Sequence, residues 1–343
     1  MLSTCGFVSS GNTGTSIEQF KANFTEVMQN QGDDSDMSYL ASIYKALNSK
    51  QYDKAIQEAE KFRNMRPGDN NVYLLEGYAY MGKKEYLSST DRFSHIIDSD
   101  NTRGDAYFFR AQNYLLSEQP EKALTDIAKA LDNKQMPAQV VQIYKNLGEK
   151  NIDTEKVTGF AFNMKAEAYR QLGQFTLAMD NANKAIEYHA TSSILYKLRG
   201  ELYLSQQNYS LAYKDLTKTV ELDSSESNAL FLMGLISLFQ GNYDIAVEQY
   251  QKANQLIPEK MIILRYMSLA YWLQGNEIKA FETIEKALKG KPNPIHFYHL
   301  AYFHHLSGNK DMALVNFKKA YKLKPDILKT RAVFMNRPPV SSP

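Results

Sequence analysis

Four histidines lie close together near the C-terminal end of this 343-residue chain, at His296, His299, His304 and His305. Imidazole nitrogens are common zinc ligands, and His296 and His299 can share one helix face because they lie three positions apart. The sequence places no cysteine and no obvious acidic third ligand beside this pair. We therefore interpret the histidines as structural and expect no bound metal.

Other residue types that could carry out catalysis are also poorly placed. Cys5 is the single cysteine, which excludes an internal disulfide framework and a cysteine-rich metal cluster. It stands in a Gly/Ser/Asn-rich segment, far along the chain from any histidine that could activate it. The sequence contains no phosphate-binding glycine loop, no nucleophile elbow and no zincin helix motif. We expect neither an enzyme nor a cofactor.

The strongest pattern in the chain is a small residue that returns about every 34 positions. It stands at Ala55, Ser89, Ala123, Ala178, Ala212, Ala246, Ala280 and Ala313. If this residue is numbered position 20 of a repeat, position 8 is also small in all units except the first, which has Ile43. Position 8 then holds Gly77, Ala111, Ala166, Gly200, Gly234, Ser268 and Ala301 in the remaining units. Two antiparallel helices approach to about 8–10 Å only where the facing side chains are small, so each unit is expected to be a helical hairpin.

Large residues complete the pattern. Position 11 is mostly tyrosine, position 24 is often large and position 27 is often alanine, and several units end at a proline. This pattern resembles the tetratricopeptide repeat, and it is clearest in the stretch NALFLMGLISLFQGNYDIAVEQYQKANQLIP. The resemblance implies an all-α, right-handed superhelical solenoid of about eight helix-turn-helix units, forming one elongated domain.

Aligning the repeats divides the chain into segments. The units fall near residues 36–69, 70–103, 104–135, 159–192, 193–226, 227–260, 261–293 and 294–325, within a solenoid spanning 36–325. Residues 1–15 are expected to be a flexible tether, 16–35 a capping helix with its linker, and 326–343 a C-terminal cap and polar tail. The helix from Ser16 to Asn30 has a second interpretation, as a docking helix for a partner.

A helical insertion of 21 residues interrupts the repeats after the third unit, within 136–158. Pro137 suits the first turn of a helix and Gly148 suits its end, so we expect an extra helix followed by a loop from Glu149 to Thr158. Two interpretations are open. The helix either packs on one edge of the stack, or it changes the superhelix pitch or forms a flap over the groove.

The N-terminal residues Leu2-Ser3-Thr4-Cys5 and the polar stretch after them resemble the processing site of a bacterial lipoprotein. The resemblance implies acylation of Cys5 and an envelope-anchored, periplasm-facing protein. Thr4 is unusual before the cysteine of such a site, and no apolar signal core precedes it. The alternative is a cytoplasmic protein with an unpaired thiol.

The resemblance also implies where a partner binds, because positions 2, 5, 9 and 12 of each first helix line the concave groove in this family. Apolar and aromatic residues occupy these positions at both ends of the chain, and charged residues occupy them in the middle. The predicted partner-binding residues are Tyr44, Tyr78, Phe108, Asn163, Glu167, Arg170, Lys197, Glu201, Phe231, Arg265, Trp272, Tyr298 and Tyr302. The lysine and asparagine that bind a chaperone carboxylate in some members are absent from the corresponding positions.

We therefore expect a protein-interaction scaffold that binds an extended or helical segment with apolar anchors. A net charge of +2 and the lack of a separate basic run give no reason to expect nucleic acid as a partner. Membrane contact is expected only through the lipid anchor. One hypothesis is an assembly factor for a pilus, a secretion system or the outer membrane, and the other is a cytoplasmic adaptor or regulatory peptide receptor. The oligomeric state is not encoded in any pattern that we recognise.

Overall fold

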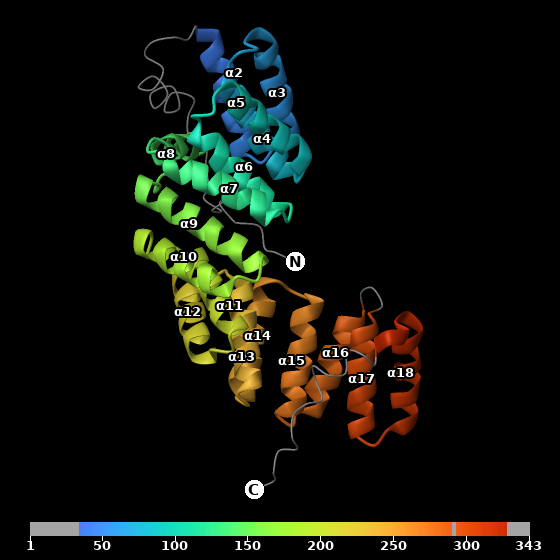
Figure 1. The fold of residues 1–343 in the computed structure, drawn as a ribbon. Helices are drawn as coiled ribbons and strands as arrows, with labels where there is room; N and C mark the ends of the chain where they lie inside the picture. The colour runs from blue at the N-terminus through green and yellow to red at the C-terminus, as the bar shows by residue number, and fades with distance from the viewer. Residues whose placement is uncertain (1–33, 290–292, 328–343) are drawn as a thin grey trace. The chain divides into compact units, whose positions relative to one another are not determined.

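The structure is a computed structural model that describes residues 34–289 and 293–327, and every regular element over these residues is a helix (Figure 1). The helices are α2 (Asp34–Asn48), α3 (Tyr52–Met65), α4 (Asn70–Lys83), α5 (Tyr86–Ser99), α6 (Gly104–Leu116), α7 (Pro120–Asp132), α8 (Met136–Asn146), α9 (Thr154–Gln171), α10 (Phe175–Tyr188), α11 (Ser193–Ser205), α12 (Tyr209–Leu222), α13 (Ser227–Phe239), α14 (Tyr243–Leu256), α15 (Met261–Leu273), α16 (Glu277–Leu288), α17 (Pro294–Leu306) and α18 (Lys310–Leu323).

These helices form two compact units that divide between Gln206 and Gln207. Unit 1 contains α2 to α11, and unit 2 contains α12 to α18. Within each unit, successive helices pack as antiparallel hairpins that stack on the next hairpin, as in α6 with α7 or α17 with α18. This arrangement confirms the predicted all-α repeat architecture. The predicted tether 1–15, the helix from Ser16 to Asn30 and most of the tail 326–343 lie outside the described residues.

The small residues of the repeat lie where two helices meet. The position-20 residue is fully buried in every repeat except the last, where Ala313 is partly exposed on α18. At position 8, a Cβ atom on Gly77 would lie 2.6 Å from the Phe93 ring, and one on Gly234 would lie 2.7 Å from the Tyr250 ring. Glycine at position 8 therefore makes room for an aromatic side chain at position 24 of the same hairpin.

A residue in the left-handed backbone conformation follows the first helix of every repeat. Gly173, Gly241, Gly275 and Gly308 have φ between 72° and 87°, as expected for glycine at a helix C-terminus. The same turn in the other four repeats uses Lys50, Lys84, Glu118 and Gln207, which also have positive φ. The repeat geometry therefore imposes this conformation even where the sequence supplies a side chain that disfavours it.

The insertion contains the expected helix, α8, but the expected loop from Glu149 to Thr158 is wrong at its C-terminal end. Helix α9 begins at Thr154, more than a turn earlier than predicted. The Asp153 side chain accepts a hydrogen bond of 2.8 Å from the backbone N–H of Lys156, and Glu155 adds negative charge to the first turn. Both features stabilise a helix start at this point, because they satisfy a free N–H group and oppose the helix dipole.

Candidate functional site

The predicted groove positions belong to the first helices of the hairpins, and we call the surface they form the first-helix face. In unit 1 it is formed by α2, α4, α6, α9 and α11, and in unit 2 by α13, α15 and α17. The two parts differ in exposure. All four groove positions of α6 are buried, whereas those of α15 and α17 are exposed or partly exposed.

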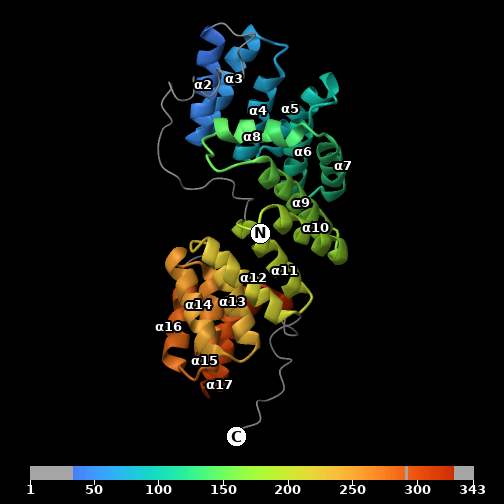
Figure 2. The same ribbon diagram turned by 90° about the vertical axis from the view of Figure 1, so that its left-hand side faces the viewer.

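The difference in unit 1 is caused by helix α8, which packs against α6 and α9 (Figure 2). Its inward side chains Met136, Val140 and Tyr144 are at most 1% exposed. The Tyr144 ring lies 5.9 Å from the Phe109 ring, centroid to centroid, in an edge contact. Helix α8 therefore completes the hydrophobic core of unit 1 by covering the first-helix face at α6 and α9.

The end of α8 reaches as far as α2. Leu147 packs against the hydrophobic cluster of the first two hairpins, and a Cβ atom on Gly148 would lie 2.8 Å from Nδ2 of Asn48. Burial raises the pKa of the Tyr44 hydroxyl to about 12, while its hydrogen bond with the Asn146 side chain acts in the opposite direction. The insertion thus spans from the first repeat to the fourth, which agrees with a flap over the groove and not with packing on one edge.

This placement corrects the expectation that the N-terminal groove residues offer an open surface to a partner. Tyr44 is 6% exposed, Phe108 is 1% exposed and Asn163 is 7% exposed. Tyr78 is half-buried, and burial raises the pKa of its hydroxyl. These side chains belong to the core of unit 1, because α8 and the segment after it occupy the space that a partner would need.

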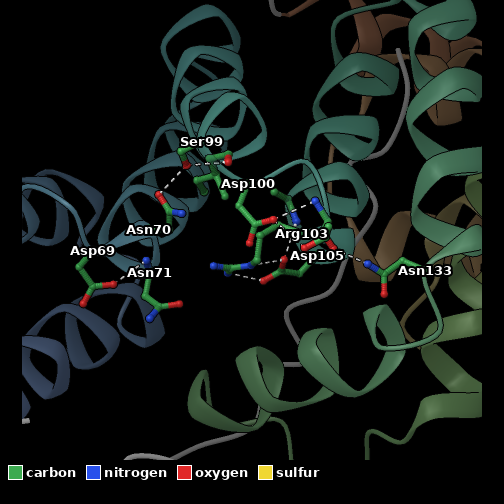
Figure 3. Close-up of polar contacts among 11 residues, drawn as sticks. Asp69, Asn70, Asn71, Ser99, Asp100, Arg103, Asp105 and Asn133 are labelled. Carbon is green, nitrogen blue, oxygen red and sulfur yellow. Dashed lines mark hydrogen bonds and ion pairs between the residues drawn. The ribbon is translucent and has the colours of Figure 1, made fainter. Parts of the chain in front are cut away.

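The start of α8 is held by polar contacts in the turns between repeats (Figure 3). The Asn133 side-chain amide donates to the backbone carbonyl of Thr102, and the Asn133 Oδ1 accepts from the backbone N–H of Gln135 at 2.8 Å. A Cβ atom on Gly104 would lie 2.6 Å from the Met136 Cβ. Glycine at the first residue of α6 therefore permits the close approach that turns the chain from α7 into α8.

The same group of turns contains a buried ion pair. Arg103 Nε and one of its terminal nitrogens donate to the two carboxylate oxygens of Asp105 at 2.9 and 2.7 Å, and Asp105 is 2% exposed (Figure 3). Asp105 occupies a groove position of α6. Its charge is thus neutralised by a neighbour within the turn, and it is not presented to a partner.

The charged middle of the face is also partly neutralised internally. Arg170 makes two 2.7 Å hydrogen bonds to the carboxylate of Glu167, and Gln171 donates to the same carboxylate at 3.0 Å. This pairing is the largest cause that raises the pKa of the Arg170 guanidinium. Lys197 and Glu201 on α11 are half-buried. Beyond α8, the partly exposed groove positions of α11 thus combine these charged residues with the apolar Ile194 and Leu204.

Unit 2 keeps its aromatic face open to solvent. Phe231, Arg265, Trp272, Tyr298 and Tyr302 are all partly exposed, on three consecutive first helices. Their inner edges are fixed by packing on buried rings. The indole of Trp272, the single tryptophan of the chain, stacks on the Phe303 ring with the centroids 4.7 Å apart. Phe231 contacts the rings of Tyr250 and Tyr266 at 5.7 and 5.4 Å.

The four histidines of α17 differ in how far they are exposed to solvent. His296 and His299 are buried, His304 is half-buried against the Phe281 ring at 4.8 Å, and His305 is exposed. Burial, followed by the positive charge of Arg265, lowers the pKa of His296 to about 4. The same causes, with a contribution from His296, lower the pKa of His299 to about 3. Within the described residues, no group of three or more metal-ligating side chains occurs.

No helix in the described part of the chain is both long enough and apolar enough to cross a lipid bilayer. The lipidation site predicted at Cys5 lies outside the described residues.

Comparisons with known proteins show which family and which solved structures this chain is similar to. The family model of the tetratricopeptide repeat matches residues 161–190, 227–260 and 297–327. A search of curated proteins gives no match. Among solved structures, a tetratricopeptide repeat protein from Parabacteroides merdae is 18% identical with a TM-score of 0.53, covering 76% of this chain and 96% of its own.

Two further structures are similar over most of the chain. The protein described in a functional characterisation of Pseudomonas aeruginosa pilF is 18% identical with a TM-score of 0.54, covering 68% of this chain and 97% of its own. A chain of the APC/C hetero-tetramer Cut9-Hcn1 is 14% identical with a TM-score of 0.59, covering 89% of this chain and 52% of its own. At these identities the likeness concerns the fold alone. The three matched segments identify tetratricopeptide repeats in both units, and the stacked hairpins give the described residues between them the same repeat fold.

Proposed function

We propose that this chain is a non-catalytic protein-interaction scaffold whose binding surface is the first-helix face of unit 2. Repeat proteins of this family generally act by binding other proteins, and their stacked helices form extended surfaces suited to a peptide or a helix. The observation that carries the proposal is the contrast between the two units. Helix α8 covers the face in unit 1 at α6 and α9, whereas no described segment covers the row of aromatic side chains on α13, α15 and α17.

The residues of this surface are suited to a partner with apolar anchors. Trp272 and Tyr298 are partly exposed, and each also contacts a neighbouring ring, so neither side chain has to be ordered anew when a partner binds. Large aromatic side chains of this kind dominate the affinity of many protein interfaces. The partner segment is proposed to be extended or helical, with apolar side chains that lie between these rings.

The test is a cross-linked pull-down from the source cells with the full chain as bait. The informative variant is Tyr298→Ser combined with Tyr302→Ser, because both side chains are partly exposed and their loss leaves the hairpin core in place. The matched control is Tyr321→Ser, which removes a 50% exposed tyrosine from the second helix of the same hairpin. We expect the double variant to lose partners that the wild-type chain and the control both recover.

A recovered partner must then bind the purified chain directly through a defined segment. If the double variant binds this segment as tightly as the wild-type chain does, the first-helix face of unit 2 is not the binding surface. Circular dichroism of each variant, which reports helix content, ensures that a loss of binding does not come from unfolding.

The location of the protein is a separate part of the proposal. We propose an envelope protein anchored through acylated Cys5, which serves the assembly of a pilus, a secretion system or the outer membrane. The support is the sequence around Cys5 alone. Metabolic labelling with palmitate, followed by membrane fractionation of wild-type and Cys5→Ser protein, provides the test. An unlabelled protein in the soluble fraction would leave the cytoplasmic adaptor or regulatory peptide receptor as the function.

A further inference from the structure

The outer side of α18 exposes a stripe of side chains that the earlier repeats largely cover. The stripe consists of positions 21, 24 and 28 of the repeat, which share one helix face because they are three and four residues apart. In α18 these positions hold Leu314, Phe317 and Tyr321, of which Leu314 is 52% exposed, Tyr321 is 50% exposed and Phe317 is partly exposed. In the other seven repeats position 24 is buried, and positions 21 and 28 are buried or partly exposed.

A helix covers this stripe in the earlier repeats. The first helix of each following hairpin packs against the second helix of the hairpin before it, as α6 does on α5 and α15 does on α14. Helix α18 packs on α17, and no described helix covers its outer side (Figure 1). The rings of Tyr298, Phe317 and Tyr321 form a row there, with centroids 6.5 and 6.4 Å apart. The stripe therefore has the spacing that receives the apolar face of a helix elsewhere in this fold.

Lysines give the same side of α18 a positive charge. Lys318 and Lys322 occupy positions 25 and 29, next to the stripe, and neither pairs with a carboxylate among the described residues. No other repeat has a basic residue at both positions, and four of them have Asp or Glu at position 29. Residues 310–343 as a whole contain eight basic residues and two acidic ones. A helix that docks on this stripe is therefore expected to be acidic.

The sequence contains a segment with the complementary properties, residues 16–30, which lie outside the described residues. Ile17, Phe20, Phe24 and Val27 recur at intervals of three and four, a pattern that predicts a helix with one apolar face. Residues 1–35 contain four acidic residues and one basic residue, whereas the charges of residues 36–309 nearly balance. A helix over 16–30 would be about 22 Å long, close to the length of the 14-residue helix α18.

We propose that the acidic segment 16–30 of one copy of this chain docks on the outer stripe of α18 in a second copy. Three residues join this segment to α2, and they span about 10 Å at most. The segment is therefore held beside the first repeat, whereas α18 belongs to the eighth, so the stripe is assigned to another copy. Because the contact joins two different surfaces, repeated association gives a row or a ring of copies.

Sedimentation velocity of the purified full chain measures this association. All proteins carry Cys5→Ser, which prevents both lipidation and a disulfide between copies. The first variant is Lys318→Glu with Lys322→Glu, and the second is Glu18→Lys with Glu26→Lys. The matched control is Lys252→Glu with Lys286→Glu, which makes the same charge change at exposed positions of α14 and α16.

We expect the sedimentation coefficient of the chain and of the control to rise with protein concentration, and to rise less at high salt because ions screen the charges. Each reversed variant alone should need at least about tenfold more protein for the same association, since like charges then face each other. An equal mixture of the two reversed variants should associate as the original chain does, because opposite charges meet again at each contact. Leu314→Ser should weaken the association at high salt as well, since the stripe contributes apolar contact.

A chain that stays monomeric at all concentrations would overturn the proposal, and would leave residues 328–343, the chain's own residues 16–30 or another acidic protein as the occupant of the stripe. A dimer that Glu18→Lys with Glu26→Lys leaves intact would also overturn it, because the contact would then not involve the acidic segment. Failure of the mixture to associate has the same meaning. Circular dichroism of each variant ensures that a loss of association does not come from unfolding.

The proposed function has a separate readout, because it concerns partners other than the chain itself. Recovery of those partners depends on the first-helix face of unit 2 and does not require Lys318 or Lys322. In the pull-down, the control Tyr321→Ser is expected to lose bound copies of the chain and to keep the other partners. A monomeric chain that still recovers them would end the inference on self-association and leave the scaffold function in place.

Discussion

A Cβ atom on Gly77 would lie 2.6 Å from Cε1 of Phe93, so these two residues share one packing position between α4 and α5. Phe93 is fully buried. The phenyl ring lies over the glycine backbone, and α4 and α5 can approach this closely only because Gly77 has no side chain. The same relation joins Gly234 to Tyr250.

This contact leads to the first prediction. Gly77→Ala should destabilise unit 1 by about 1–2 kcal/mol, because the cost of overpacking exceeds the gain of about 1 kcal/mol in helix propensity. The double variant Gly77→Ala with Phe93→Leu should lose less stability than the sum of the losses in the two single variants. Chemical denaturation measures the free energies, with Gly68→Ala as the control, since a Cβ at Gly68 meets nothing within 4 Å. Additive losses in the double variant would contradict the shared packing position.

The insertion provides the second prediction. Val140→Asp places a carboxylate at a fully buried position of α8 and should release this helix from α6. Ala138→Asp, on the exposed side of α8, is the matched control. Limited proteolysis should cut the first variant within 134–153 at a protease concentration that leaves the control intact. Equal resistance of the two variants to the protease would show that the buried side chains of α8 do not hold this helix against α6.

The third prediction concerns pH. The pKa of His299 is lowered to about 3 in the folded chain, so the unfolded chain, with a pKa near 6.5, binds protons first as the pH falls. Stability from the two buried histidines is therefore complete above pH 6.5 and declines by about 3 kcal/mol for each histidine towards pH 4. Urea unfolding followed by Trp272 fluorescence measures this slope. His299→Leu should flatten it, whereas a change at exposed His305, such as His305→Gln, should not.

The fourth prediction compares a buried ion pair with an exposed one. Arg110 binds Asp126 with hydrogen bonds of 2.7 and 2.9 Å, and Asp126 is 3% exposed. Asp126→Asn leaves the arginine without a counter-charge and should cost about 3 kcal/mol. Breaking the exposed pair of Lys218 and Glu221 by Glu221→Gln should cost less than about 1 kcal/mol. Thermal unfolding of both variants tests this ranking. Similar shifts in melting temperature for Asp126→Asn and Glu221→Gln would contradict it.

The fifth prediction uses the left-handed turns. Glu118 has φ of 58° at the turn where other repeats have glycine. Glu118→Gly should raise the stability of unit 1 by up to about 1 kcal/mol, because it removes the steric cost of this conformation. Glu121→Gly, inside α7, should lower stability by about 1 kcal/mol. Thermal unfolding measures both variants. A loss of stability in Glu118→Gly as well would show that the positive φ at this turn does not carry a steric cost that glycine relieves.

The repeat architecture could be predicted from the sequence because one small residue per hairpin is required at each helix crossing. Ala123 or Ala246 cannot be enlarged without separating two helices, so the period survives even when other positions vary. The turns at Gly241 and Gly275 were predictable for a similar reason. The equivalent turns at Lys84 and Glu118 were not, since there the packing on both sides enforces a conformation that the residue itself disfavours.

The candidate site was harder to predict because exposure depends on contacts between segments that are distant in the sequence. The groove positions give no sign that Phe108 is covered while Phe231 is open. The signal that could have helped is Gly104, a glycine at a helix start that the repeat pattern does not require. It marks the close approach of Met136 and with it the direction in which α8 leaves the stack.

Helix α8 also determines how a competitor would have to act. Because a short turn joins it to α7, it is a tethered ligand whose effective concentration is on the order of millimolar or higher. A free segment present at micromolar concentration must therefore bind the unit 1 face far more tightly than α8 does before it displaces a measurable fraction. Mutations that weaken the hold of Asn133 on Thr102 lower this threshold without altering any residue of the face itself.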